Sequence, residues 1–222
     1  MIRALLFKEW LKIRWFWAAA MAIHFAFFLR FFFDIRRRIG SEHAEMVWYQ
    51  TIHLGTLLYS DIRYLPLFTG LVLAAAQFIP EILGRRLRLT LHLPMHRDGM
   101  LLICLTAGLS GLLSLCLLDA VFIPLILAKT FPASVALSSL PTMLPWILAG
   151  VLAYLGGVTL LLETSWPRRV VLAIVFSILI GLHYSGRGYG WLIPALPWLI
   201  GLIPFFLAAV FESGRRFRQR GA

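Results

Sequence analysis

The feature that most constrains this chain is the recurrence of long uncharged stretches. Residues 142–162 and 191–211 contain no charged side chain, nor do residues 100–118. A helix needs about 20 apolar residues to cross the roughly 30 Å hydrocarbon core of a bilayer. The 222 residues are 60% hydrophobic, with a mean hydropathy of +0.84, which is too apolar for a soluble domain of this size. The sequence therefore predicts an all-α polytopic membrane protein.

Charged and turn-forming residues divide residues 1–222 into six apolar runs within a single transmembrane domain. At a rise of about 1.5 Å per residue, the first of these runs, residues 15–33, matches a hydrocarbon core of about 30 Å. The predicted spans are residues 15–33, 64–83, 100–128, 142–162, 170–184 and 191–211. An interfacial helix over residues 1–14 precedes them, and a basic tail over residues 212–222 follows.

Residues 1–14 have a helical pattern of their own. Apolar side chains recur at steps of three or four residues, at Ile2, Leu6, Trp10, Ile13 and Trp17. Lys8 and Lys12 lie on the opposite face. This pattern predicts an amphipathic helix at the cytoplasmic membrane interface, with its tryptophans at headgroup depth. The alternative is that residues 1–14 are simply the basic flank of the first span.

The net charge of +11 concerns membrane topology rather than nucleic-acid binding, because the basic residues flank apolar runs instead of lining one face. With both termini inside, the inner segments hold 14 Lys and Arg residues and the outer segments hold 7. This ratio favours cytoplasmic termini under the positive-inside rule. Arg36, Arg37 and Arg38 fall on the outer side and oppose that orientation.

The segment from Gln77 to Met100, QFIPEILGRRLRLTLHLPMHRDGM, joins the second and third spans. Leu83, Leu87 and Leu91 recur at helical spacing before Pro94 interrupts the pattern. This stripe predicts a short amphipathic helix at the cytoplasmic surface that docks on a soluble protein. On charge alone, an ordinary basic loop that obeys the positive-inside rule is equally consistent.

This segment resembles the first intracellular loop of ABC-2 type transporter permeases. The resemblance covers about two dozen residues and rests on Glu81, Gly84, the leucine series and Leu93-Pro94-Met95-His96-Arg97. The helix over residues 1–14 likewise resembles the interfacial elbow helix of that family. Members of the family often have a Gly-Thr pair after the Glu, whereas here Arg85 and Arg86 follow Gly84, so the resemblance assigns no subfamily or substrate.

The resemblance implies a multi-pass permease subunit of an ATP-driven exporter in the cell (inner) membrane. A second permease subunit, identical or related, would complete the pathway, and separate ABC ATPase subunits would bind residues 84–98, the coupling loop. Membrane lipids surround such a subunit, and nucleic acid is not among its expected partners. The implied ATPase-coupling residues are Glu81, Arg85, Arg86, Leu87, Arg88, Leu91, Pro94 and Arg97.

Motifs for cofactors are missing from the sequence. No G-x-x-x-x-G-K-[ST] occurs, so ATP and magnesium are expected on the partner ATPase and no cofactor on this chain. His92 and His96 are four residues apart, but Asp98 is the only nearby carboxylate, which makes a metal site improbable. Cys104 and Cys116 fall in one apolar run and are expected to be buried thiols.

Two other function classes stay open. Gly108-Leu109-Ser110-Gly111 and His183 resemble the serine motif and membrane histidine of rhomboid proteases. A serine nucleophile needs a histidine at the same depth, whereas Ser110 is expected at mid-span and His183 near the outer end. Small residues such as these also serve close helix packing. The third class is a non-catalytic membrane scaffold.

Asp119 is the one acidic residue within the predicted third span, which would be about 43 Å long if it were straight. We therefore expect the span to tilt, to kink at Pro124, or to break near Asp119. Asp119 is a candidate for the transport pathway, because ionisable residues within membranes are usually functional. It is equally consistent with a helix cap at the outer interface. At the outer end of the first span, Arg30 and Asp34 are expected to form a local ion pair.

Overall fold

The computed structural model describes residues 2–41, 44–84, 97–186 and 188–219. Within these ranges the regular structure is entirely helical. The α-helices are α1 (Ile2–Ser41), α2 (Ala44–Ile52), α3 (Leu65–Leu83), α5 (Arg97–Ala128), α6 (Ala133–Leu162), α7 (Trp166–Gly181), α8 (Leu196–Ile200) and α9 (Leu202–Gln219). Three short 3-10 helices join them: η1 (Ser60–Tyr64), η2 (Leu182–Tyr184) and η3 (Ile193–Ala195).

Six helical segments of the described chain are long and apolar enough to cross a membrane. They are Arg3–Ser41, Ser60–Leu83, Gly99–Ala128, Ala133–Leu162, Trp166–Tyr184 and Ile193–Gln219. The predicted all-α fold is therefore confirmed for the described residues, as is the predicted number of helices that are long and apolar enough to cross a membrane. Their length and composition indicate a membrane protein.

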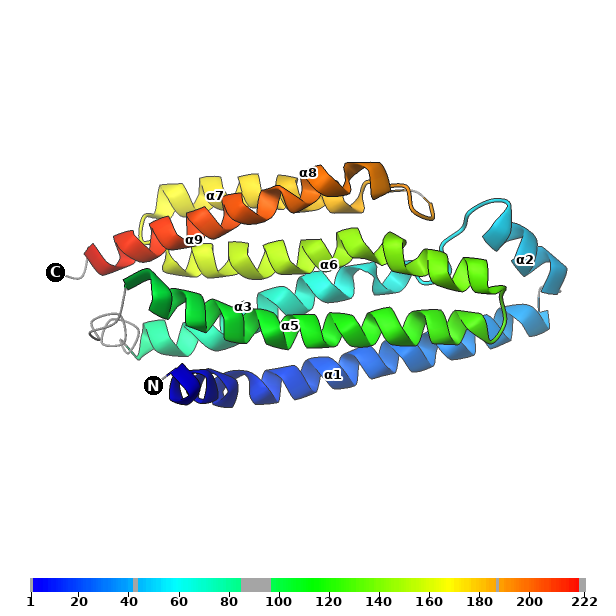
Figure 1. The fold of residues 1–222 in the computed structure, drawn as a ribbon, viewed down its shortest axis with the longest axis horizontal. Coiled ribbons are helices and arrows are strands. Elements are labelled where there is room, and N and C mark those ends of the chain that lie inside the picture. Colours follow the sequence, from blue (N-terminus) through cyan, green and yellow to red (C-terminus); the bar gives the residue numbers. More distant parts are fainter. Residues whose placement is uncertain (1, 42–43, 85–96, 187, 220–222) are drawn as a thin grey trace.

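The six spans run side by side, and each is antiparallel to the one before it (Figure 1). The start of α1 and the end of α9 lie at the same end of the bundle, called the termini end below, and α2 lies at the opposite end, the α2 end. The last residues of α3 and the first residues of α5 are also at the termini end. The two flanks of the predicted coupling loop therefore lie beside both termini.

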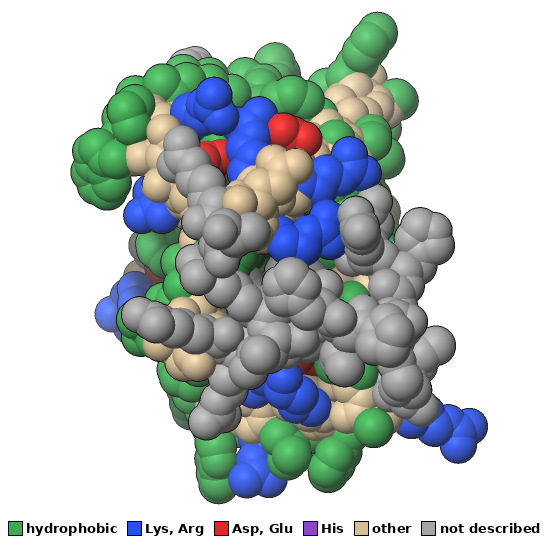
Figure 2. Space-filling view, turned by 90° about the vertical axis from the view of Figure 1, so that its left-hand side faces the viewer, with side chains coloured by type: hydrophobic (Ala, Val, Ile, Leu, Met, Phe, Trp, Pro, Cys, Tyr) green, Lys and Arg blue, Asp and Glu red, His purple; other side chains and the backbone are tan. Residues whose placement is uncertain are grey.

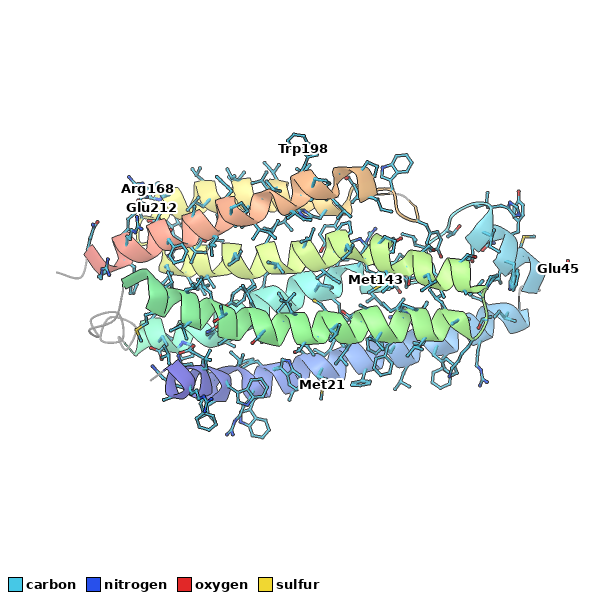
Figure 3. All side chains as sticks on the ribbon, in the orientation of Figure 1. Met21, Glu45, Met143, Arg168, Trp198 and Glu212 are labelled. Atoms are coloured by element: carbon cyan, nitrogen blue, oxygen red, sulfur yellow. The ribbon has the colours of Figure 1, made fainter. Side chains whose placement is uncertain are left out.

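Helix α6 is the centre of the bundle, because it packs against α3, α5, α7 and α9. Helix α1 packs on α5 and α3 at one edge. In the most apolar stretches of the second, third and fourth spans, 50% to 61% of the residues are buried, against 22%, 11% and 17% in the first, fifth and sixth. The peripheral spans thus expose apolar side chains, as a lipid environment requires. In Figure 3, Met143 lies between helices, whereas Trp198, which is 82% exposed, projects outward.

Close packing of α3 on α6 depends on two glycines. A Cβ atom added to Gly70 would lie 2.3 Å from the carbonyl oxygen of Gly150, and one added to Gly150 would lie 2.7 Å from the carbonyl oxygen of Pro66. Neither distance is compatible with a side chain, so the two backbones approach as closely as glycine permits. Small residues at such contacts are typical of membrane helices, whose association depends on close packing.

Several helices extend beyond the predicted spans. The outer loop expected over residues 129–141 shrinks to residues 129–132, because α6 begins at Ala133 and contains Pro141 and Pro145. Membrane helices tolerate such prolines because neighbouring groups satisfy the freed carbonyls. Helix α7 begins at Trp166 rather than at residue 170, and α9 continues through most of the predicted tail to Gln219.

The two special helices inferred from the sequence have different outcomes. Residues 2–14 are continuous with the first span in α1, so no break separates an elbow helix from that span, and the placement of these residues at the membrane interface stays a prediction. The coupling helix falls on residues 85–96, which lie outside the described residues.

Candidate functional site

Four charged side chains at the termini end join the first helix to the end of the second span. The Nζ atom of Lys12 lies 2.7 Å from Oε1 of Glu81 and 2.5 Å from Oε1 of Glu9. The Nζ atom of Lys8 lies 3.1 Å from the same oxygen of Glu81. Glu9 and Glu81 are only 1% and 5% exposed, and their two charges are balanced by the two lysines, as buried carboxylates require. We call Lys8, Glu9, Lys12 and Glu81 the charged cluster.

Gln77 extends the charged cluster to the other central helices. Its side-chain nitrogen donates hydrogen bonds to Oε2 of Glu9 at 2.8 Å and to the carbonyl oxygen of Cys104 at 2.7 Å. Its side-chain oxygen accepts a hydrogen bond from the hydroxyl of Tyr154 at 2.7 Å. Four spans, α1, α3, α5 and α6, are therefore connected through one buried amide.

Helical spacing explains why these side chains meet. Glu9 and Lys12 are three residues apart in α1, and Gln77 and Glu81 are four apart in α3, so each pair shares one helix face. Gly108 of α5 makes room for the link to α6, because a Cβ atom there would lie 2.1 Å from the hydroxyl of Tyr154. Glu9 and Lys12 of α1 are thus turned into the bundle, while Leu6 and Trp10 of the predicted apolar stripe are 37% and 41% exposed.

Of the predicted ATPase-coupling residues, Glu81 is the one whose side chain the structure describes. It belongs to the charged cluster, directly before the loop. Arg97 is the first residue of α5. The other six, Arg85, Arg86, Leu87, Arg88, Leu91 and Pro94, lie outside the described residues. The sequence analysis did not identify Glu9 and Gln77 as site residues. Both lie among apolar residues, and a polar side chain in such surroundings usually has a buried polar partner.

A second buried polar cluster lies within the spans, toward the α2 end from the charged cluster. Nδ1 of His24 in α1 lies 2.6 Å from Oδ1 of Asp119 in α5, and Nε2 of His24 lies 3.0 Å from the hydroxyl oxygen of Thr69 in α3. His24 is 1% exposed and Asp119 is fully buried. The second carboxylate oxygen of Asp119 has no hydrogen-bond partner in the described part of the chain. His24 thus joins α1 to both α3 and α5.

Of the two interpretations of Asp119, the helix cap is wrong, and a place in the transport pathway stays a prediction. Helix α5 is unbroken through Asp119 and Pro124, so Asp119 neither breaks the helix nor caps it at an interface. The reason is that His24, which sequence reasoning did not consider, supplies a buried partner 95 residues away. The predicted Arg30–Asp34 pair is also wrong. Arg30 bonds Asp61 at 3.3 Å, and Asp34 bonds Arg37 and Arg38 of its own helix.

The fourth and fifth spans are joined by residues 163–165, whereas the sequence predicts spans that end at residue 162 and begin at residue 170. Glu163 is 1% exposed; its carboxylate accepts a hydrogen bond from the backbone NH of Ser165 at 3.0 Å and lies 3.8 Å from Nη1 of Arg216. Arg169 donates to the carbonyl oxygen of Glu163. Lys and Arg side chains are spread across this end of the bundle (Figure 2). Among the residues described there, Arg3, Arg14, Arg168 and Arg215 are exposed.

The proposed serine and histidine of a protease are each bonded within their own segment. The hydroxyl of Ser110 donates to the carbonyl oxygen of Ala107 at 2.8 Å, and Nδ1 of His183 lies 3.2 Å from the carbonyl oxygen of Leu179. No hydrogen bond joins Ser110 to His183 in the described structure. Gly108 and Gly111 instead pack against Tyr154 and Ile13. This geometry gives no support to a serine nucleophile.

Other chemistry has little support in the described ranges. They contain no group of three His, Cys, Asp or Glu side chains that could hold a metal ion. Cys104 and Cys116 are buried free thiols, as expected from the sequence.

Comparisons with protein-family models, with curated proteins and with solved structures found no match to the chain. The fold therefore defines the class, an all-α protein with six apolar helices that indicate a membrane location, and function must be inferred from the geometry.

Proposed function

We propose that this chain is the membrane-spanning subunit of an ATP-driven exporter, similar to ABC-2 type permeases. In this proposal the spans form part of a translocation pathway, and residues 84–97 dock on a separate ATPase. The support comes from the resemblance of residues 77–100 to the first intracellular loop of that family and from the position of Glu81. The chain itself would bind neither ATP nor magnesium.

The observation that carries the proposal is the contact of Glu81 with Lys8 and Lys12. Glu81 is three residues from the start of the proposed coupling loop, and its carboxylate is held by α1 at 2.7 and 3.1 Å. Gln77, one turn earlier, connects the same cluster to α5 and α6. A displacement of the loop would therefore act on four spans together, which is what a subunit driven from outside the membrane needs. A passive anchor would not require this connection.

The basic termini end supports the proposed orientation. Lys and Arg residues at the flanks of spans favour the cytoplasmic side, and ATP is available there. Both termini and the coupling loop would then be cytoplasmic. A second permease subunit, identical or related, would complete the pathway, and movement of the ATPases would change the access of the pathway between the two sides.

Purification of the tagged chain from native membranes tests this proposal. We expect an ATPase subunit to co-purify and the assembly to hydrolyse ATP. The triple variant Arg85→Glu, Arg86→Glu, Leu91→Asp places three charges where the proposed contacts are basic or apolar. It should lose the ATPase and at least about tenfold of the hydrolysis, because buried interface contacts of this kind contribute roughly 2 kcal/mol or more each.

A matched control carries the same kinds of change at the α2 end. Arg36→Glu, Arg37→Glu and Leu54→Asp alter exposed residues and should leave both the assembly and its hydrolysis unchanged. If no ATPase accompanies the folded chain, or if the loop variant behaves like this control, the exporter proposal is wrong and a scaffold role is favoured.

A further inference from the structure

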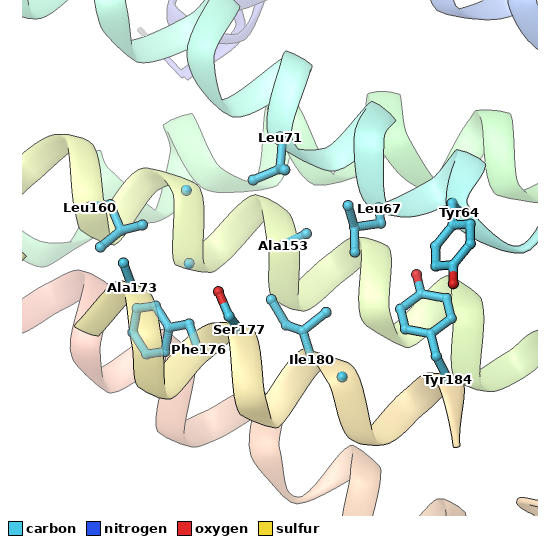
Figure 4. A pocket seen from close by; sticks show the side chains of 13 residues that line it. Tyr64, Leu67, Leu71, Ala153, Leu160, Ala173, Phe176, Ser177, Ile180 and Tyr184 are labelled. Carbon is cyan, nitrogen blue, oxygen red and sulfur yellow. The ribbon is translucent and has the colours of Figure 1, made fainter. Parts of the chain in front are cut away.

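An apolar cavity of about 280 Å³ lies between α3, α6 and α7 (Figure 4). Ligand pockets in proteins typically begin near roughly 300 Å³. The walls include Leu67, Leu71, Ala153 and Ala173, and the hydroxyl of Ser177 is among the few polar groups along it. All three helices are membrane-spanning segments, so the apolar part of the cavity lies at the depth of lipid chains.

The α2 end of the cavity has a different character. Tyr64 and Tyr184 line it there, with ring centroids 5.0 Å apart. The hydroxyl of Tyr184 is buried and has no hydrogen-bond partner in the described part of the chain. Tyr64 is 41% exposed, so this end reaches the surface of the bundle. Tyrosines at the end of a span are typical of the membrane interface.

A positively charged side chain lies next to the α2 end of the cavity. The guanidinium of Arg63 lies 4.5 Å from the ring centroid of Tyr64. Arg63 forms no ion pair with a described residue. Asp61, two residues earlier, pairs with Arg30 at 3.3 Å. From the membrane interface into the bundle, the site therefore consists of the Arg63 guanidinium, then the Tyr184 hydroxyl, then the apolar cavity.

We propose that this cavity binds one acyl chain of an anionic phospholipid, with the lipid phosphate at Arg63. The chain lies along Leu67, Leu71 and Ala173, and the hydroxyl of Tyr184 donates a hydrogen bond to an oxygen of the glycerol esters. The order of charge, hydroxyl and apolar wall matches the order of phosphate, ester and chain in a lipid. This site does not depend on the exporter proposal, because it lies in one subunit and involves none of the coupling residues.

Photoactivatable lipids in nanodiscs of phosphatidylcholine test the site. Phosphatidic acid and phosphatidylcholine with the same diazirine-bearing acyl chain would be compared, and labelled peptides identified by mass spectrometry. We expect phosphatidic acid to label residues 153–160 and 173–184 about tenfold more than phosphatidylcholine, because the choline cation offsets the phosphate charge of phosphatidylcholine at Arg63 and a full charge-assisted bond contributes roughly 1.5 kcal/mol or more.

Two kinds of variant distinguish the binding of the lipid headgroup from the binding of its acyl chain. Arg63→Gln should bring the labelling by the two lipids close to equal, because it removes the cation that distinguishes the anionic headgroup from the zwitterionic one. Ala173→Phe should abolish labelling by both, because the ring fills the cavity. Ser177→Leu, a change at an exposed position of the same wall, is the second filling variant if Ala173→Phe does not fold. Lys129→Gln removes a cation that lies over Phe32, away from the cavity, and should change nothing.

The proposal is overturned by any of three results. The first is equal labelling of the original chain by both lipids, and the second is labelling that persists in a folded cavity-filling variant. The third is a loss of preference in Lys129→Gln as large as that in Arg63→Gln.

Discussion

Lys12→Met is expected to destabilise the folded chain by about 3–5 kcal/mol, the typical cost of removing one partner of a buried ion pair. The loss leaves two almost fully buried carboxylates. Glu81 keeps its ion pair with Lys8, whereas Glu9 loses its pair with Lys12. Total stabilities are commonly about 5–15 kcal/mol, so a loss of this size should lower the unfolding temperature markedly. The measurement is the recovery of monodisperse protein in detergent after a temperature series.

A control and a rescue distinguish charge imbalance from a general loss of helix stability. Arg14→Met removes an exposed basic residue two positions further along α1, and we expect a change within about 0.5 kcal/mol. Adding Glu9→Gln to Lys12→Met restores the balance of one positive and one negative charge, and it should recover most of the lost stability. Equal effects of Lys12→Met and Arg14→Met, or no rescue, would mean that the charged cluster does not hold α1 against α3.

His24→Leu is expected to cost a similar 3–5 kcal/mol, because it leaves the carboxylate of Asp119 buried without a partner. Asp119→Leu should cost less, about 1–3 kcal/mol, since His24 keeps its hydrogen bond to Thr69 and leaves one ring nitrogen unsatisfied. The double variant removes both polar groups from the apolar interior and should be more stable than His24→Leu alone. Thermal unfolding of the four proteins in one detergent gives the coupling energy directly.

Additive effects in this cycle would contradict a direct contact between His24 and Asp119. A useful comparison is Thr106→Val on α5, which removes an exposed hydroxyl that is bonded within its own helix. It should cost much less than either single variant.

The six long apolar helices were predictable because hydropathy depends on local sequence. Long uncharged runs such as residues 142–162 fix the number of spans without any knowledge of their partners. The short connection after the fourth span follows from the same pattern, since Glu163, Pro167 and two arginines interrupt two apolar runs within a few residues. Cys104 and Cys116 were expected to be buried because of the run that contains them.

The helix ends were less predictable, because a proline can either end a helix or lie inside a continuous membrane helix. The sequence predicts a loop that ends at Pro141, whereas Pro141 lies inside the continuous helix α6. Pro124 likewise does not interrupt the helical assignment of α5. In a membrane, neighbouring helices can satisfy the groups that proline leaves free, and a single sequence does not identify those neighbours.

The polar clusters were the least predictable part of the site. Glu9 meets Gln77 across 68 residues of sequence, and His24 meets Asp119 across 95. Neither separation follows from a helical period, so the partners are set by how the spans pack. What the sequence does offer is a list of candidates, because a polar residue within an apolar run needs a partner. His24, which lies in the first predicted span, is one of these candidates.

Cysteine labelling from each side of the membrane tests the central claim that ATP-driven force enters at the termini end. In a chain with Cys104→Ala and Cys116→Ala, Arg88→Cys marks the proposed coupling loop and His53→Cys marks the α2 end. With a membrane-impermeant maleimide on intact cells, His53→Cys should react, and Arg88→Cys should react only after the membrane is opened. Reaction of Arg88→Cys from outside intact cells would place the loop away from ATP and would contradict the account.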